Sequence, residues 1–291
     1  MKNKIKQPQS EEKEKNEMNE FQVKGHEPSL LPAGQWKMVW NDEFDGTELD
    51  RSKWDYRLSM MGKRHPAWVD RGVHLDGESN AVFSLLEEDG RPVSAQLQTG
   101  YNFMDEPVIQ TKFGNDHLQW NIGKLRENLY THTYGYYECR CKLQQHPEGW
   151  WSAFWMQSPI IGASLDPAES GTELDIMECF NLGKVASHNA FTGGYGLDCK
   201  RECVGGMDNL DATVFHRFGM KWDENGYTFY VDGVEDGHID KYVSKRPEFI
   251  LISTEVKGYR HETHQAVKEA FDLIGKDVFL VDYVRVFDPV K

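Results

Sequence analysis

The stretch Glu173-Leu174-Asp175-Ile176-Met177-Glu178 places three carboxylates in a segment that its apolar, aromatic-rich surroundings predict to be a buried strand. Side chains alternate between the two faces of a strand, so Glu173 and Asp175 share one face. Strict alternation would put Glu178 in the core, where an isolated ionised carboxylate is strongly disfavoured. We therefore expect a β-bulge near Ile176-Met177 that turns Glu178 to the face of the other two acids. The stretch predicts a row of three acids on one concave face.

Neighbouring carboxyl groups suit the hydrolysis of a glycosidic bond with retention. That reaction uses one carboxylate as nucleophile and a second carboxyl as proton donor, about 5–5.5 Å apart. Crowding of like charges raises the pKa of at least one group, so the two can hold different protonation states, and Asp175 between them can support this difference by hydrogen bonding. On a flat strand the backbones of Glu173 and Glu178 would lie about 13 Å apart, so the strand has to curve inward.

The same stretch resembles the E-x-D-x-x-E signature of glycoside hydrolase family 16, in the branch that carries a bulge. Further segments resemble other motifs of that family and occur in the same order. They are residues 39–46, Trp54, and residues 133–138, 215–222, 230–233 and 281–286. The resemblance covers residues 36–288, which is most of the chain.

The resemblance implies a role for each acid. Glu173 would attack the anomeric carbon, Glu178 would protonate the leaving oxygen and later activate water, and Asp175 would tune Glu173. The implied activity is that of a retaining endo-β-glycosidase. Its substrate would be a β-linked polysaccharide, either a 1,3- or 1,3-1,4-glucan or an agar- or porphyran-type galactan. A lectin-like binding module and a transglycosylase remain as alternatives on the same fold, although a pure binder has no use for three adjacent acids.

Short segments separated by turn residues predict an all-β protein. Residues 29–291 are expected to form one domain, a two-sheet β-jelly-roll sandwich (concanavalin-like) with a concave substrate cleft. The charged residues 1–28 are expected to form a disordered tail. Asn225-Gly226 predicts a two-residue hairpin turn, and helical spacing predicts one helix over 262–274. The expected strands are 36–40, 79–86, 94–98, 132–144, 151–157, 172–180, 184–191, 214–222, 226–231, 248–256 and 278–287.

Aromatic side chains in surplus suggest a surface that stacks on sugar rings, because aromatic residues make up 12% of the chain and nine of them are Trp. The large core of a sandwich is the alternative explanation. In the basic loop 60–71 we expect Trp68 to stack on a sugar while Arg64 or Arg71 binds hydroxyls or a sulfate, unless the loop is only solvated. The candidate substrate-binding residues are Trp68, Arg71, Trp120, Trp151, Trp155, His188 and Glu255.

The resemblance supplies two of these candidates. It implies that Trp155 forms the floor of the cleft, for which core packing is the alternative. It also implies that His188, on the next strand, lies within reach of the acids, although a lone histidine in a strand is more often a satisfied polar group. Trp120 belongs to residues 113–130, which are expected to form a second wall. Glu255 lies at the polar end of a strand, where it can contribute to a subsite.

Charge and hydropathy exclude some partners. The net charge of -14 argues against nucleic acid and anionic membranes, because both require basic surface. The sequence has no apolar run of about 18 residues, and no apolar core follows the first lysines. We expect a monomer that is cytoplasmic as written, although enzymes of the resembling family are usually secreted, so the compartment stays open.

The five cysteines contain no C-x-x-C pair. Cys139 and Cys141 are expected to be core residues, whereas Cys199 and Cys203 are expected in a loop, where they can form a disulfide in an oxidising compartment. No cofactor is expected. The resemblance allows a structural calcium ion with Glu43 and Asp282 as candidate ligands, and surface hydration of both carboxylates is the alternative.

Overall fold

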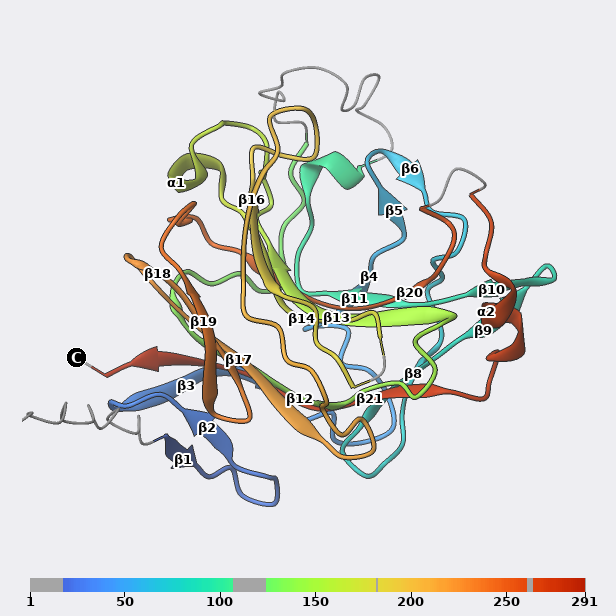
Figure 1. Cartoon of the computed structure of the whole chain (residues 1–291), viewed down its shortest axis with the longest axis horizontal. Coiled ribbons are helices and arrows are strands. Elements are labelled where there is room, and N and C mark those ends of the chain that lie inside the picture. Colours follow the sequence, from blue (N-terminus) through green and yellow to red (C-terminus); the bar gives the residue numbers. More distant parts are fainter. Residues whose placement is uncertain (1–17, 107–123, 182, 261–263, 291) are drawn as a thin grey trace, which may run out of the picture.

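The computed structural model describes residues 18–106, 124–181, 183–260 and 264–290, which form a sandwich of two antiparallel sheets (Figure 1). The two layers lie one above the other in Figure 1, and the loops that carry β5, β6 and α1 rise from the outer side of the upper layer. The all-β, two-sheet architecture predicted from the sequence is confirmed.

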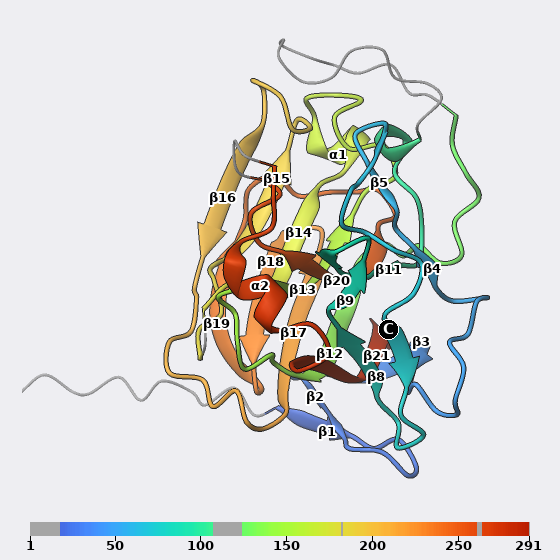
Figure 2. The same ribbon diagram turned by 90° about the vertical axis from the view of Figure 1, so that its right-hand side faces the viewer.

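The seven-stranded sheet carries the acidic stretch. Its order is β16 (Lys200–Val204), β15 (His188–Thr192), β14 (Glu173–Cys179), β13 (Trp150–Gln157), β20 (Phe249–Val256), β11 (Gln96–Gln98) and β4 (Asp55–Tyr56). Figure 2, turned by 90°, shows this sheet running from β16 at one edge to β4 at the other. The acidic strand β14 is therefore an interior strand, held on both sides.

The eight-stranded sheet packs beneath it. Its order is β19 (Val234–Ile239), β18 (Gly226–Val231), β17 (His216–Asp223), β12 (Gly135–Lys142), β21 (Val278–Pro289), β8 (Ala81–Ser84) and β7 (Val73–Leu75), and β3 (Trp36–Asp42) also pairs with β21. Six further strands form three two-stranded pairs, which are β1 (Asn19–Phe21) with β2 (Ser29–Leu31), β5 (Ser59–Met60) with β6 (Lys63–Arg64), and β9 (Leu86–Glu88) with β10 (Arg91–Val93). The described helices are short and comprise η1 (Phe103–Asp105), α1 (Pro167–Ser170) and α2 (Lys268–Asp272).

Alternate residues of the facing strands fill the core between the sheets. Phe154 and Met156 of β13 and Cys139 and Cys141 of β12 belong to one buried cluster. Each fully buried large apolar side chain stabilises the fold by about 1.5–3 kcal/mol. The expectation that Cys139 and Cys141 are core residues is confirmed.

The N-terminal part of the domain differs from its prediction. Residues 18–28 were expected to be disordered, yet β1 pairs with β2, and the Phe21 ring meets Phe287 edge-on with centroids 5.0 Å apart. Met18 and Phe21 pack with Leu31 on the outer face of the eight-stranded sheet. These two apolar residues find a partner surface that the charged composition of the tail conceals. Residues 1–17 of the predicted tail lie outside the described residues.

The predicted helix is shorter than its pattern suggests. Helix α2 spans only Lys268–Asp272, because Val267 is extended and its N–H donates to the Lys257 carbonyl rather than to a helical neighbour. Residues 261–263 lie outside the described residues. Strands β16 and β19 were not predicted, and β15 begins at His188 instead of residue 184. In the described part of the chain, no helix has the length and apolar character needed to cross a membrane.

The hairpin between β17 and β18 is confirmed, but its turn differs from the expected one. Asp223 pairs with Gly226, so the two turn residues are Glu224 and Asn225. The Asp223 carboxylate accepts a hydrogen bond from the Asn225 backbone N–H (2.8 Å), and this local bond stabilises the turn.

Candidate active site

Strand β14 contains the bulge that the three acids require. Trp155 of β13 pairs with Asp175, whereas the preceding residue, Phe154, pairs with Met177, so Ile176 is an extra residue without a ladder partner on β13. Ile176 and Met177 both lie in the core, and Glu178 therefore returns to the face of Asp175. The predicted bulge at Ile176-Met177 is confirmed, and so is the placement of the three acids on one face.

The acids line a cleft on the outer face of the seven-stranded sheet. Strands β11, β13, β14 and β20 form its floor, and loops that precede and follow the sheet strands form its walls. The lining residues are Arg57, Met60, Met61, Gln96, Asp105, Trp151, Ala153, Trp155, Glu173, Asp175, Glu178, Tyr195, Ser253, Glu255 and Arg260.

One amide joins two of the acids. The side-chain nitrogen of Asn189, on β15, donates to Asp175 Oδ2 (3.1 Å) and approaches Glu178 Oε2 (3.5 Å). Asn189 pairs with Asp175 across the β14–β15 ladder, which fixes its position opposite the acids. Asn189 thus orients the middle and last carboxyl groups relative to one another.

Glu173 has partners of its own. The Tyr195 hydroxyl donates to Glu173 Oε2, and the Gln157 amide lies 3.4 Å from the same oxygen. Gln157 also contacts the Tyr195 hydroxyl, so the three side chains form one network. Hydrogen bonds to a carboxylate favour its charged form, and Glu173 is the acid that receives a hydroxyl donor.

The three carboxyl groups titrate differently. Burial and then the negative charge of Glu173 raise the pKa of Glu178 to about 7. Burial followed by the charges of Glu178 and Glu173 raises the pKa of Asp175 well above its usual value. Burial also raises the pKa of Glu173, but the Tyr195 hydroxyl and the Arg57 guanidinium oppose this rise. Near neutral pH, Glu178 can therefore hold a proton while Glu173 has the strongest support for ionisation.

Two arginines bring positive charge into the cleft. Arg57 Nε donates to Asp105 Oδ2 (2.7 Å), and its guanidinium lies 5.3 Å from the Trp155 ring centre. Arg260 donates through Nε and Nη2 to both oxygens of Glu255 (2.7 and 2.6 Å). Each guanidinium has further N–H groups beyond these bonds. The two guanidiniums thus lie among the carboxylates of the cleft and offset part of their negative charge.

Three of the predicted substrate-binding residues lie in the cleft. Trp151 and Trp155 contribute aromatic surface, and the Trp155 indole N–H donates to Ser253 Oγ (2.9 Å). Glu255 is also a lining residue, where it holds Arg260. Trp120 lies outside the described residues.

Trp68 and Arg71 do not line the cleft, and the burial of Trp68 contradicts its predicted stacking on a sugar, whereas the predicted role of Arg71 stays a prediction. Trp68 is only 1% exposed and stacks on His65 with ring centres 4.1 Å apart. Arg71 pairs with Glu88 at the surface (2.9 Å), and Arg64 donates to the Leu58 carbonyl. Periodicity carries no information on which way a loop side chain points, and this loop turns its tryptophan into the protein.

His188 is also placed differently from its prediction. Its side chain is fully buried, it is not a lining residue, and its ring stacks on Phe229 with centres 4.5 Å apart. Alternation along β15 directs Asn189 to the acids and His188 to the opposite side of the sheet. The alternative of a satisfied polar histidine is therefore the correct one.

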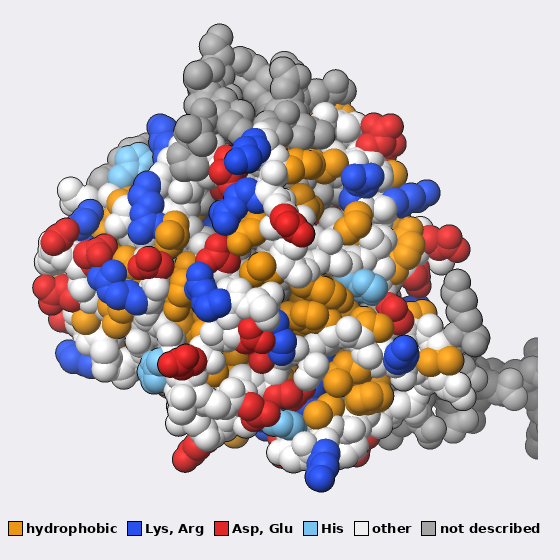
Figure 3. Space-filling view, turned by 180° about the vertical axis from the view of Figure 1, so that it is seen from behind, with side chains coloured by type: hydrophobic (Ala, Val, Ile, Leu, Met, Phe, Trp, Pro, Cys, Tyr) orange, Lys and Arg blue, Asp and Glu red, His pale blue; other side chains and the backbone are white. Residues whose placement is uncertain are grey.

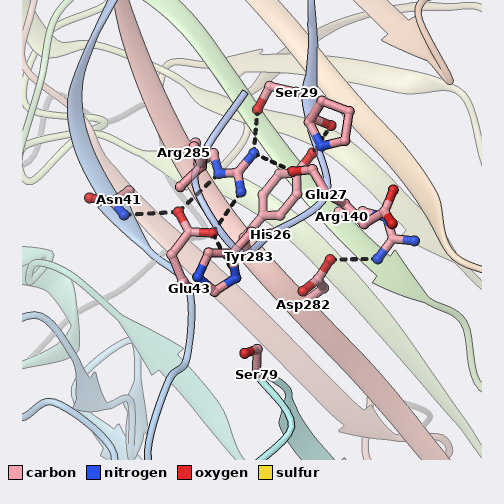
Figure 4. A network of polar contacts seen from close by, with 12 residues as sticks. His26, Glu27, Ser29, Asn41, Glu43, Ser79, Arg140, Asp282, Tyr283 and Arg285 are labelled. Atoms are coloured by element: carbon pink, nitrogen blue, oxygen red, sulfur yellow. Dashed lines mark hydrogen bonds and ion pairs between the residues drawn. The ribbon is translucent and has the colours of Figure 1, made fainter. Parts of the chain in front are cut away.

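The calcium candidates are both engaged by arginine. Glu43 accepts two hydrogen bonds from Arg285 (2.9 and 2.7 Å), and Asp282 accepts one from Arg140 (Figure 4). A guanidinium beside each carboxylate disfavours a second cation there. No group of three or more His, Cys, Asp or Glu side chains suited to a metal occurs in the described residues. Both candidate ligands are thus held by arginine side chains in this structure.

In this structure, Cys199 and Cys203 lie too far apart to form a disulfide bond. Cys203 lies on β16 rather than in a loop, and Cys199 immediately precedes that strand. Four extended steps of about 3.3 Å separate their backbones by about 13 Å, whereas a disulfide needs about 4.4–6.8 Å between Cα atoms. A bridge would require β16 to unfold.

Several lining residues were not predicted from the sequence, among them Arg57, Gln96 and Tyr195. Tyr195 belongs to the glycine-rich segment 193–196, and Gly193 and Gly194 both adopt positive φ. That segment is a turn signal in the sequence, but only the fold brings its tyrosine to Glu173. Arg57 and Gln96 lie on or beside short strands at the far edge of the sheet, where the sequence pattern is weakest.

Comparisons with known proteins agree with this geometry. A family model described as the GH16 domain of beta-porphyranase A-D matches residues 36–289. Glucan endo-1,3-beta-glucosidase A1 of Niallia circulans is 28% identical over 207 residues, which cover 67% of this chain but only 28% of that protein. Beta-porphyranase B of Zobellia galactanivorans is 29% identical over 226 residues, with coverages of 69% and 68%.

A solved structure shows the same fold. The laminarinase from Rhodothermus marinus superposes with a TM-score of 0.63 at 22% identity, covering 89% of this chain and 100% of that one.

Proposed function

This chain belongs to glycoside hydrolase family 16, whose members are retaining glycoside hydrolases, and from that premise we propose that it cleaves internal β-linkages of a polysaccharide with Glu173 as nucleophile and Glu178 as acid and base. The observation that carries the proposal is the bulged strand β14, on which these two acids flank Asp175 in an aromatic cleft. The pKa of Glu178 near 7 gives one of the two a proton at neutral pH.

In the first step, Glu173 attacks the anomeric carbon while Glu178 gives its proton to the glycosidic oxygen. The Tyr195 hydroxyl and the Gln157 amide hold Glu173 Oε2 and leave Oε1 as the oxygen that attacks. Trp151 and Trp155 supply flat apolar surface for the sugar rings.

In the second step, the same charges change the role of Glu178. Once Glu173 is esterified it carries no charge, and one of the causes that raise the pKa of Glu178 is removed. The pKa of Glu178 therefore falls in the covalent intermediate, and its carboxylate can accept a proton from the attacking water. Asp175, held by Asn189, stays between the two acids throughout.

For the substrate we propose a sulfated β-galactan of the porphyran type. Arg57 and Arg260 place two cations beside the acid row, and a sulfate ester would use the N–H groups that they have beyond Asp105 and Glu255. The matching family model, which describes beta-porphyranase domains, supports the same choice. The carboxyl groups and water suffice for both chemical steps, so we propose that activity requires no cofactor.

A neutral β-1,3- or 1,3-1,4-glucan is the second candidate. The Niallia circulans relative is named as a glucan endo-1,3-beta-glucosidase, and the two tryptophans of the cleft would stack equally well on glucose rings. Transfer of the sugar to another sugar instead of water remains a third outcome, because it proceeds through the same covalent intermediate.

The test is product release from porphyran, agarose, κ-carrageenan, laminarin and lichenan by the purified protein. We expect cleavage of porphyran with oligosaccharides of several lengths appearing early, as internal cleavage produces. Glu173→Gln should lower turnover by about 10⁴-fold or more, because it removes the nucleophile, while its melting temperature stays at or above that of the wild type.

Chromatography of the products against added oligosaccharide acceptors distinguishes hydrolysis from transfer. A Glu173→Gln protein that keeps ordinary turnover would refute the assigned mechanism, and cleavage of laminarin alone would replace the galactan by a glucan. Binding of one glycan without cleavage of any would favour the lectin-like alternative.

A further inference from the structure

The bulge that places the acids leaves one backbone carbonyl in need of a partner. An extra residue in a strand interrupts the ladder, and its buried backbone groups still require hydrogen bonds. On the β13 side the ladder passes from Asp175 to Met177 and omits Ile176, and on the β15 side the paired register ends at Asp175. The two ladders therefore give the Ile176 carbonyl no regular donor.

His188 supplies that donor. Its Nδ1 lies 2.7 Å from the Ile176 carbonyl oxygen, so Nδ1–H donates to it from the neighbouring strand. The side chain is fully buried, and the parallel Phe229 ring fixes the plane of the imidazole with an interplanar angle of 3°. The hydrogen bond is consequently made by a rigid group rather than by a mobile one.

The other ring nitrogen is tied to the opposite sheet. His188 Nε2 lies 3.1 Å from Asp236 Oδ2, on β19, and the same oxygen accepts the Gly206 backbone N–H (2.8 Å). The imidazole and the Gly206 N–H together hold the Asp236 carboxylate in place. The chain of contacts runs from β19 through Asp236 and His188 to the bulge residue, and it crosses the interior of the sandwich.

We propose that His188 is a positioning residue, which fixes the bulge at Ile176 and thereby the location of Glu178 beside Asp175. Without the Nδ1–H donor, the Ile176 carbonyl would be buried and unsatisfied, which disfavours the present register of the strand. The strand can avoid this cost by moving the extra residue along the chain, and any such move turns Met177 or Glu178 away from its present face. His188 touches neither the acids nor the cleft and acts through the backbone alone.

Two substitutions separate the two nitrogens. The side-chain amide of Asn lies where Nδ1 lies and that of Gln reaches the position of Nε2, so His188→Asn keeps the donor to Ile176 and His188→Gln keeps the donor to Asp236. Both lose the stack on Phe229, which makes each the control for the other. The kinetic readout rests on the proposed function and uses porphyran, or laminarin if the glycan panel selects it.

We expect His188→Gln to lower kcat by about 10²-fold, with KM within about twofold, because a displacement of about 1 Å costs that much in other enzymes. His188→Asn should stay within about fivefold of the wild-type kcat. Crystal structures should show Glu178 displaced in His188→Gln and unmoved in His188→Asn. A His188→Gln enzyme within threefold of wild type, or equal losses in both variants, would overturn the proposal.

Asp236 provides the test if His188→Gln does not fold. Asp236 lies on the edge strand β19, and its side chain is 17% exposed. Asp236→Ala should lower kcat by about fivefold at constant KM, whereas Asp236→Asn, whose amide still offers Nε2 a hydrogen-bonding partner, should change it little. An Asp236→Ala enzyme with unchanged kcat would contradict the inference. If the wild type cleaves no glycan, the proposed function fails, and the crystal structures alone decide the role of His188.

Discussion

In the proposed mechanism, Glu178 must carry a proton when the glycosidic bond breaks and must lack one when water attacks. Its surroundings suit both requirements, because burial, Glu173 and Glu255 raise its pKa while Arg260 opposes them. Glu173 accepts a hydrogen bond from the Tyr195 hydroxyl, and this bond favours its ionised form. The division of labour between two identical side chains thus follows from their neighbours rather than from their chemistry.

The activity of the free enzyme should fall as the pH rises through 7. Above the pKa of Glu178, about 7, the proton donor is lost, and kcat/KM should drop by about tenfold per pH unit. On the acidic side, activity should fall as Glu173 is protonated, at a pH above 4.5 because its pKa is raised. Initial rates measured over a series of pH values give both the acidic and the alkaline limb of the pH–activity profile.

Glu255→Gln is the control for this assignment. It removes one of the charges that raise the pKa of Glu178 and leaves Arg260, which lowers it, without its partner. Both changes move the alkaline limb to lower pH. An alkaline limb that stays in place would mean that another group limits the rate.

The Arg260 guanidinium in the cleft leads to a further prediction at the residue scale. The double variant Glu255→Gln/Arg260→Gln removes the cation without leaving a buried carboxylate unpaired. If Arg260 binds sulfate, KM for porphyran should rise by about tenfold or more, the value of one charged contact, while KM for agarose changes less. Initial rates on the two galactans measure the difference, and equal effects on both would remove Arg260 from sulfate recognition.

The sequence predicts the acids better than it predicts the residues around them. Glu173, Asp175 and Glu178 could be assigned because three carboxylates in a buried strand require a reason. Trp68 is expected at the substrate because its aromatic ring suits sugars, and His188 because the family resemblance implies it, but the direction of each side chain depends on loop path and strand register. Both side chains point into the protein.

At the scale of the element, strand β14 tolerates its extra residue because the flanking registers agree. Asp175 pairs with Trp155 and Glu178 pairs with Ala153, and these two partners lie two residues apart on β13. A regular strand without Ile176 would make the same two pairings. The strand's existence and its bulge could be predicted from residue pattern. The edge elements β4, β16 and β19 could not, because they are short or carry charged residues, and their pairing is set by tertiary packing.

Deletion of Ile176 should leave Glu178 on the cleft face. The shortened strand alternates regularly, so the cost is the loss of one buried side chain, about 2–5 kcal/mol. The Ile176 carbonyl disappears as well, and His188→Gln should therefore have no additional effect on kcat in this background. Steady-state kinetics on the four proteins of this cycle measure the coupling; additive losses would contradict it.

At the scale of the whole molecule, a second buried polar network ties the N-terminal segment to the sandwich. Arg285 is 0% exposed and, besides Glu43, donates to the Glu27 carbonyl (2.9 Å) and Ser29 Oγ (3.0 Å), as Figure 4 shows. The segment before residue 36, where the family match begins, is thus part of the folded unit.

The surface has mixed charge, and Figure 3 shows basic and acidic side chains interspersed on the face seen there.

Arg285→Met should destabilise the protein by about 3–5 kcal/mol, because it leaves the Glu43 carboxylate buried without a compensating charge. Adding Glu43→Gln should restore part of that loss. A chelator should leave the melting temperature unchanged if the guanidinium is the cation of this site. Urea unfolding of the three proteins and a thermal scan with EDTA test these expectations. A large chelator effect would indicate that a metal ion contributes to stability.

The position of β16 at the edge of the seven-stranded sheet affects how copies of the protein meet. An edge strand presents backbone groups that can pair with another chain and so promote aggregation. Here Lys200, Arg201 and Glu202 follow one another along that edge. A second strand could dock only by desolvating this charged row. The charged row therefore disfavours pairing of two copies of the protein through β16.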